Sequence, residues 1–95
     1  MLQKVVQSRL FARKVKKLSK QNKYFLDEEI RNLMEKPLSG DEKKGDLKGV
    51  FVYKFLMGTT KYLLAYRFSD DLLELIMLGP HENYYRDLKS YLKSG

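Results

Sequence analysis

The sequence predicts one α+β domain over residues 1–95, in the order β-α-α-β-β-β-α, with a helical hairpin packed on an antiparallel sheet and a C-terminal helix. Two periodicities carry this prediction. Apolar residues recur at helical spacing in the first third of the chain and at its end, whereas residues 51–78 show the two-residue repeat and the apolar runs of strands. Because the helices are grouped apart from consecutive strands, an α+β arrangement is expected rather than an alternating one. With 43% hydrophobic residues, a chain of 95 residues suits one modest core.

The N-terminal third is expected to form a strand and two helices. Leu2, Val5 and Val6 suggest a short strand, and Ser8 is a suitable N-cap for the helix that follows. Each helix has apolar residues at positions i, i+4 and i+7, namely Phe11, Val15 and Leu18 in the first, and Leu26, Ile30 and Leu33 in the second. Pro37 should end the second helix, because the residue before a proline is disfavoured in the helical region.

A charged loop separates these helices from the strands. Residues 38–49 contain three glycines and six charged side chains, which leave little to bury. Three strands are expected after the loop, with turns at 57–60 and 69–71, and they cover residues 51–56, 62–68 and 72–78. Gly79-Pro80 should end the last strand. The final helix then has one apolar side, made of Tyr84, Leu88, Tyr91 and Leu92.

The net charge of +7 comes entirely from the first quarter of the chain. Residues 1–26 carry no acidic side chain and eight basic ones, which are Lys4, Arg9, Arg13, Lys14, Lys16, Lys17, Lys20 and Lys23. A surface of one sign favours a polyanion or an acidic partner protein, although a solvated helix face that keeps the protein soluble is the plainer alternative.

Composition also excludes several kinds of site. The chain has no cysteine, which excludes disulfides, thiolate zinc sites and thiol catalysis. Its single histidine excludes a histidine-rich metal site within one chain, so we expect no metal and no cofactor. No apolar run approaches the ~20 residues of a membrane span, and the basic N-terminal segment does not fit a signal peptide. We therefore expect a cytoplasmic protein without a membrane partner.

The single histidine, His81, marks the segment with the most chemical potential. It follows Gly79-Pro80 and precedes Tyr84, Tyr85 and Arg86. An imidazole can exchange a proton near neutral pH, a tyrosine can stack on a base, and an arginine can pair with phosphate. The segment is compatible with a phosphodiester-cleaving site and equally with an ordinary strand-to-helix joint.

These elements in this order resemble the RelE/ParE toxin superfamily of bacterial and archaeal toxin–antitoxin systems. Three parts of the sequence carry the resemblance. Pro37 through Gly49 is similar to the loop that follows the family's helical hairpin, and residues 52–55 with 62–66 are similar to its paired central strands. Ile76 through Tyr85 is similar to its last strand and the loop that holds a catalytic residue. The resemblance extends over roughly residues 2–93.

The resemblance implies a toxin that a cognate antitoxin protein holds inactive, and it leaves the toxic activity open. Most RelE-like members are endoribonucleases (mRNA interferases) that cut mRNA at the ribosome and so inhibit translation. ParE-like members poison DNA gyrase and need no nuclease site. A weakly toxic relative that mainly binds its antitoxin is a third alternative. The histidine favours the ribonuclease.

For RNA cleavage the resemblance implies a small set of catalytic residues. His81 occupies the place of the family's acid–base residue, and Tyr85 matches an aromatic that stacks on the base or holds the phosphate. Lys54 matches a lysine that offsets charge in the transition state. Arg67 is a second candidate cation, although its position on the strand is not the family's usual one. Each has a plainer alternative: a helix cap for His81, packing for Tyr85, and solvated or structural strand residues for Lys54 and Arg67.

The match also has two departures and one electrostatic consequence. Leu63 stands where many nuclease members have arginine, and Leu56 stands where a second lysine is often found. The cationic clamp on the phosphate is therefore thinner than in other members. RNA contacts are expected from basic residues outside the catalytic set, namely Arg9, Arg13, Lys16, Lys17, Lys20 and Lys48.

Overall fold

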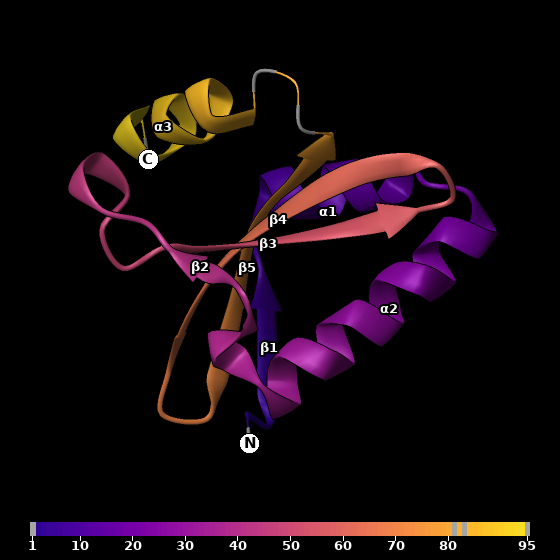
Figure 1. The fold of residues 1–95 in the computed structure, drawn as a ribbon, viewed down its shortest axis with the longest axis horizontal. Coiled ribbons are helices and arrows are strands. Elements are labelled where there is room, and N and C mark those ends of the chain that lie inside the picture. Colours follow the sequence, from indigo (N-terminus) through magenta and orange to yellow (C-terminus); the bar gives the residue numbers. More distant parts are fainter. Residues whose placement is uncertain (1, 81, 83, 95) are drawn as a thin grey trace.

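One five-stranded sheet with helices on both faces makes up the chain (Figure 1). A computed structural model describes residues 2–80, 82 and 84–94. The elements in chain order are β1 (Lys4–Gln7), α1 (Arg9–Lys16), α2 (Lys20–Glu35), the 3-10 helix η1 (Pro37–Ser39), β2 (Asp41–Glu42), the 3-10 helix η2 (Gly45–Leu47), β3 (Phe51–Met57), β4 (Thr60–Ser69), β5 (Leu72–Pro80) and α3 (Tyr84–Ser94). The strands lie side by side in the order β1-β5-β4-β3-β2.

The predicted α+β class and order are confirmed, with the two-residue strand β2 added before β3. The sheet is mixed rather than antiparallel throughout, because β1 runs parallel to β5 while the other three strand pairs are antiparallel. Two helices and the β3–β4 hairpin lie between β1 and β5 in the chain. A connection of this length can bring the chain back in the same direction, which a tight turn cannot do.

Successive strand residues point to opposite faces of the sheet, so each face has its own core. On one face, which we call the α1/α2 face, the buried residues include Phe11, Leu26, Leu33, Phe51, Phe55, Leu64, Tyr66, Leu73, Leu75 and Leu78. On the other, which we call the α3 face, they include Leu47, Val50, Val52, Leu63, Ala65, Ile76, Met77, Tyr84 and Leu88. The continuous apolar run of β5 is explained by its burial on both faces.

A β-bulge in β5 changes which face its residues reach. Ala65 of β4 pairs with Met77, whereas the next residue, Tyr66, pairs with Leu75, so Ile76 is an extra residue on β5. Ile76 and Met77 consequently both lie in the α3-face core, although they are consecutive. Beyond the bulge, Gly79 lies on the α3 face.

Two expectations at the loops need correction. Residues 38–49 contain the end of η1, all of β2 and all of η2 rather than loop alone, and Leu47 is only 4% exposed. This leucine is buried against Val50 and its neighbours, so the loop is anchored despite its charges. Strand β5 also continues through Gly79 to Pro80, where Pro80 pairs with Tyr62. A proline at the last residue of a strand removes no donor from the strand's interior.

The helix boundaries follow local capping chemistry. The Oγ of Ser8 accepts a hydrogen bond from the Phe11 N–H at 3.0 Å, as expected for the N-cap of α1. Ser19, which the sequence did not single out, caps α2 in the same way by accepting from the Asn22 N–H at 3.1 Å. Helix α2 ends at Glu35, two residues before Pro37, as predicted.

A buried tyrosine hydroxyl holds the segment that leads into β2. Tyr66 donates to the Pro37 carbonyl at 2.5 Å and accepts from the Gly40 N–H at 3.0 Å. Gly40 lies so close that an added Cβ would be 2.8 Å from this hydroxyl and 3.0 Å from the Val52 carbonyl oxygen. We call the Tyr66–Pro37–Gly40 contact the tyrosine clamp. Burial raises the pKa of Tyr66, so its hydroxyl keeps the proton that it donates.

A second tyrosine joins α2 to β3. Tyr53 donates to Glu29 Oε2 at 2.6 Å. Burial, followed by this hydrogen bond to a carboxylate, raises the pKa of Tyr53 to about 12. The protonated form of Tyr53 is therefore favoured in the folded state.

Replacing Tyr66 with phenylalanine tests the tyrosine clamp. The variant leaves the Gly40 N–H and the Pro37 carbonyl without this partner, so we expect a loss of about 1–3 kcal/mol in the free energy of unfolding. Urea unfolding followed by circular dichroism measures it. Tyr62→Phe, a half-buried tyrosine on the same strand, is the matched control and should change stability by less than about 0.5 kcal/mol. Equal losses in both variants would contradict the clamp.

The Tyr53–Glu29 contact predicts a loss of stability at high pH. Since the pKa of Tyr53 rises from 10 in the unfolded chain to about 12 in the fold, its contribution is complete below pH 10 and declines as pH rises through 12. Urea midpoints measured between pH 8 and 12 should fall less steeply for Tyr53→Phe than for the wild type. Parallel profiles for the two proteins would mean that the contact does not form in solution.

Candidate functional site

Strand pairing places Lys54 in one row with the end of β5. Lys54 of β3 pairs with Leu63 of β4, and Leu63 pairs with Gly79 of β5. Neighbouring strands are ~4.8 Å apart, so the backbones of Lys54 and Gly79 are separated by roughly 10 Å. A lysine side chain can cover much of that separation. His81 follows Gly79 by two residues in the sequence and lies outside the described residues.

Next to this row the α3 face of the sheet is open. Lys54 and Leu56 of β3 and Lys61 of β4 are exposed there, and Leu56 pairs with Lys61. We call these three residues the open floor. Leu56 is 63% exposed, so a large apolar side chain of β3 faces solvent here. The position at which relatives often have a second lysine therefore offers an apolar contact surface between Lys54 and Lys61.

Leu63, the second departure from the family pattern, is part of the core. It is fully buried in the cluster that contains Tyr84 and Leu88. An arginine at this place would have to bury a charge or displace its neighbours. The side chains around position 63 thus pack against a leucine, which is consistent with the absence of an arginine there.

The two tyrosines of α3 have different environments. Tyr84 is 1% exposed and donates to the Met77 carbonyl at 2.7 Å. Its ring packs over Gly79, where an added Cβ would be 3.5 Å from the ring. Burial raises the pKa of Tyr84 far above its ordinary value, so it stays protonated and structural. Tyr85 is half-buried and meets the Tyr84 ring edge-on, with ring centroids 5.8 Å apart.

A cation that the sequence did not single out lies over Tyr85. The Nζ of Lys43 is 5.2 Å from the centroid of the Tyr85 ring, within the range of cation–π contacts. Lys43 comes directly after β2, more than forty residues before Tyr85 in the sequence. Only the tertiary fold brings them together, since no local pattern joins the two.

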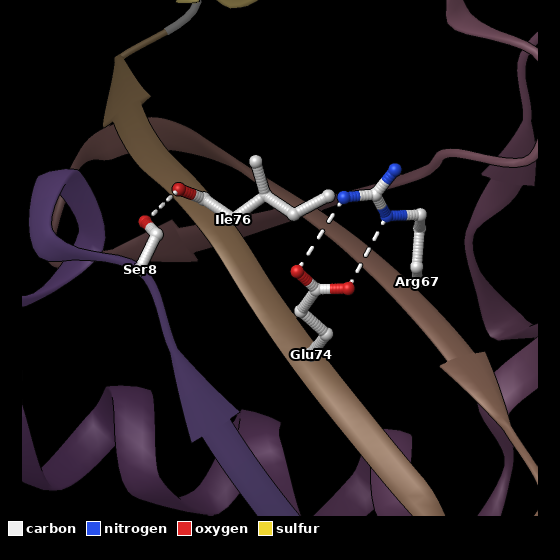
Figure 2. A network of polar contacts seen from close by, with 4 residues as sticks. All are labelled: Ser8, Arg67, Glu74 and Ile76. Carbon is white, nitrogen blue, oxygen red and sulfur yellow. Dashed lines mark hydrogen bonds and ion pairs between the residues drawn. The ribbon is translucent and has the colours of Figure 1, made fainter. Parts of the chain in front are cut away.

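Arg67 is not brought together with Lys54. Figure 2 shows its guanidinium on the Glu74 carboxylate, with Nε 3.3 Å from Oε1 and Nη2 3.4 Å from Oε2. It lies four residues beyond Leu63 on β4, or about 13 Å along the strand from the row of Lys54. Both partners of the pair are about half exposed, so the pair contributes little to stability. The geometry favours the structural alternative for Arg67.

Figure 2 also shows how the start of α1 is attached to the bulge of β5. The hydroxyl of Ser8 donates to the Ile76 carbonyl at 2.5 Å while its oxygen caps α1. The tertiary bond thus fixes α1 against β5, and α1 carries much of the basic surface of the protein.

The basic residues predicted to contact RNA are all exposed, but they form separate groups. Arg9, Arg13 and Lys16 line a shallow hollow of about 480 Å³ along α1. Lys17 lines a smaller one of about 150 Å³, together with Lys14 and the end of β5. Lys20 begins α2, and Lys48 lies on the loop before β3.

Lys14 was not among the predicted contacts, yet it has a notable position. It lines the same hollow as Tyr62, Leu78 and Pro80. Pro80 is the last residue that the structure describes before His81. In the sequence, Lys14 was noted only as one residue of the basic run in the first quarter of the chain. Its proximity to β5 depends on how α1 packs.

Two further observations concern metals and membranes. Among residues 2–80, 82 and 84–94, no three histidine, cysteine, aspartate or glutamate side chains are grouped so that they could hold a metal ion. Within the same part of the chain, every helix is too short or too polar to cross a lipid bilayer.

The fold is similar to solved toxin structures from E. coli. The free-state structure of a doubly substituted RelE matches with a TM-score of 0.74 and 16% identity, over 98% of each chain. The toxin in the intact RelBE toxin–antitoxin complex matches with a TM-score of 0.66 and 17% identity, over 83% of this chain and 96% of that one. The isolated RelE toxin matches with a TM-score of 0.63 and 17% identity, over 93% of this chain and 97% of that one. No curated protein sequence matches the chain.

The sequence itself matches a family model. The model describes the ParE-like toxins of type II bacterial toxin–antitoxin systems, and it covers residues 5–89. That range extends from the second residue of β1 into α3 and therefore includes all of the sheet except Lys4, and the row of Lys54. The chain belongs to the ParE-like toxins of type II bacterial toxin–antitoxin systems.

Proposed function

We propose that this toxin is a metal-independent endoribonuclease that cuts mRNA at the ribosome in the cytoplasm and so inhibits translation. The observation that carries the proposal is the exposed Lys54, in one row with the end of β5 that leads to His81. Similarity of the fold to E. coli RelE supports it. Cleavage would proceed by attack of the RNA 2′-hydroxyl on the neighbouring phosphate, with departure of the 5′-oxygen.

Each residue then has one role. His81 moves a proton, either from the attacking hydroxyl or to the leaving oxygen, because an imidazole does both near neutral pH. Lys54 offsets the charge that builds on the phosphate oxygens. Tyr85, half-buried at the start of α3, supports the base or the phosphate. Tyr84 takes no part, since it is buried and remains protonated.

The RNA backbone would follow the basic surface of α1. Arg9, Arg13 and Lys16 share one hollow, and Lys14 with Lys17 reaches the end of β5. Neutralising phosphates with such side chains releases counterions and makes binding depend strongly on salt. This arrangement would lead a single strand from α1 toward the reacting phosphate.

The partner that restrains the toxin is, in this proposal, an antitoxin protein. The family description and the similarity to a toxin held in the RelBE complex support this partner. Large exposed apolar side chains offer it contacts, and they are Val5, Val6, Tyr24, Phe25, Leu38 and Leu56. An acidic or amphipathic segment would also complement the basic surface of α1.

Gyrase poisoning is the second candidate function. The buried Leu63 favours it, because the arginine of many nuclease members is missing there. The family description also names ParE-like toxins. A gyrase poison would inhibit DNA supercoiling and leave mRNA uncut, so the same induction experiment separates the two functions.

His81→Ala tests the proposed nuclease. Cells that express the wild type briefly should show new 5′ ends within translated mRNA, mapped by primer extension. Loss of the acid–base group should lower the cleavage rate by about 10²–10⁴-fold. Supercoiling of a reporter plasmid is measured in the same cells. Unchanged cleavage by the variant would remove His81 from the mechanism, and supercoiling loss without cleavage would favour gyrase poisoning.

Lys54→Gln tests whether the lysine in the row that leads to Gly79 acts on the phosphate. Removing a cation from the phosphate should reduce cleavage by about 10²-fold or more, whereas Arg67→Gln should change it by less than about threefold because Arg67 lies at the far end of β4. Lys61→Gln, an exposed lysine of the open floor, is the matched control for lost charge. If Arg67→Gln abolished cleavage and Lys54→Gln did not, the assignment of the cation would be reversed.

A further inference from the structure

Three lysines surround a hollow between β2 and β3, on the side of α3. Lys43, Lys44 and Lys48 line it together with Glu42 and Gly45, and its volume is about 340 Å³. We propose that this hollow is a phosphate subsite for single-stranded RNA, with Tyr85 supporting the attached base. The inference rests on the proposed ribonuclease function and adds a second contact surface to it. Of these lysines, only Lys48 was expected to bind RNA.

The hollow and α3 are joined by Lys43. Its backbone N–H donates to the Val50 carbonyl at 2.8 Å, which extends the β2–β3 pairing by one residue. Its ammonium then lies 5.2 Å from the Tyr85 ring centroid. Figure 1 shows the loop after β2, in magenta, beside α3. A cation and an aromatic ring are thus presented together at the rim of the hollow.

The loop that forms the hollow is held in place before any ligand arrives. The tyrosine clamp fixes Pro37 and Gly40 ahead of β2, and the buried Leu47 anchors the other side. Gly45 turns the chain with a positive φ of 68°. Because these contacts order the loop in advance, a ligand loses less of its binding energy to ordering it.

The charge of the hollow favours an anion. Among the five lining residues, three lysines stand against one glutamate, which leaves a charge of +2. Like charges held close together repel, and a bound phosphate relieves that repulsion. The negative charge of Glu42 offsets the charge of one lysine, so two positive charges remain for the ligand.

The neighbouring aromatic ring favours RNA over an acidic peptide. Single-stranded nucleic acids are bound by combining basic grooves with aromatic rings on which bases stack. Lys43 and Tyr85 supply both within one contact. The hollow also lies on the same face of the sheet as the proposed cleavage site, since Val50, which pairs with Lys43, is four residues, or about 13 Å, before Lys54 along the sheet. One RNA strand could contact both places on the α3 face.

The test measures binding apart from cleavage. A fluorescently labelled single-stranded RNA with 2′-O-methyl groups cannot be cut through its 2′-hydroxyl, so its affinity is obtained by anisotropy at several salt concentrations. The test variant changes Lys43, Lys44 and Lys48 to glutamine. The control variant changes three exposed lysines elsewhere, Lys4, Lys36 and Lys93, to glutamine and so carries the same net charge.

We expect the hollow variant to raise the dissociation constant about tenfold. The slope of log affinity against log salt concentration should become shallower by an amount that corresponds to about one lost phosphate contact or more. The control should change the dissociation constant less than about threefold. Tyr85→Leu should weaken binding whereas Tyr85→Phe, which keeps the ring, should not. Equal weakening by the two lysine variants would overturn the subsite, because it would show a dependence on net charge alone.

Two further outcomes separate this inference from the proposed function. If wild-type toxin cuts mRNA and the hollow variant binds RNA as well as wild type, the subsite is wrong and the ribonuclease stands. If the hollow variant loses binding but wild type cuts no mRNA, the subsite stands and the ribonuclease is wrong. A poly-glutamate peptide that depends on the same lysines and binds more tightly than RNA would overturn the choice of RNA.

Discussion

Strand β5 pairs with β1 along one edge and with β4 along the other, and both of its faces are buried. The other elements take their positions from it. The hydroxyl of Ser8 attaches α1 to the Ile76 carbonyl, and the hydroxyl of Tyr84 attaches α3 to the Met77 carbonyl. Two side-chain hydroxyls thus bond to consecutive carbonyls at the bulge. A helix on each face is tied to the same point of the same strand.

The surfaces for which we propose functions lie where this packing stops. Lys54 and Leu56 are exposed because α3 does not cover that end of the sheet, and the hollow of Lys43 lies where β2 is only two residues long. Rigid pairing beneath them holds the cations in place without burying them. The charges can therefore act on a ligand, since their ammonium groups are not removed from solvent by burial.

Periodicity and local chemistry made much of the fold predictable. The i, i+4, i+7 spacing around Phe11 and Leu26, the cap at Ser8 and the break at Pro37 are local features, and all appear in the structure. Strand β2 was missed because two residues show no period. The parallel pairing of β1 was missed because it depends on which strand lies beside it after the whole chain has folded.

The candidate site was less predictable for the same reason. Residue types and resemblance indicated His81, Lys54 and Tyr85, but the row from Lys54 to Gly79 depends on strand register. Lys43 and Lys14 reach the site only through tertiary packing. The bulge at Ile76 has a consequence for tolerance to insertions and deletions. Because Ile76 is the extra residue, deleting it would leave Leu75 and Met77 opposite their β4 partners in regular alternation, with Gly79 still facing Tyr84. Deleting Leu78 instead would move Gly79 to the face opposite Tyr84 and pull α3 out of position, although each deletion removes one residue from the same strand.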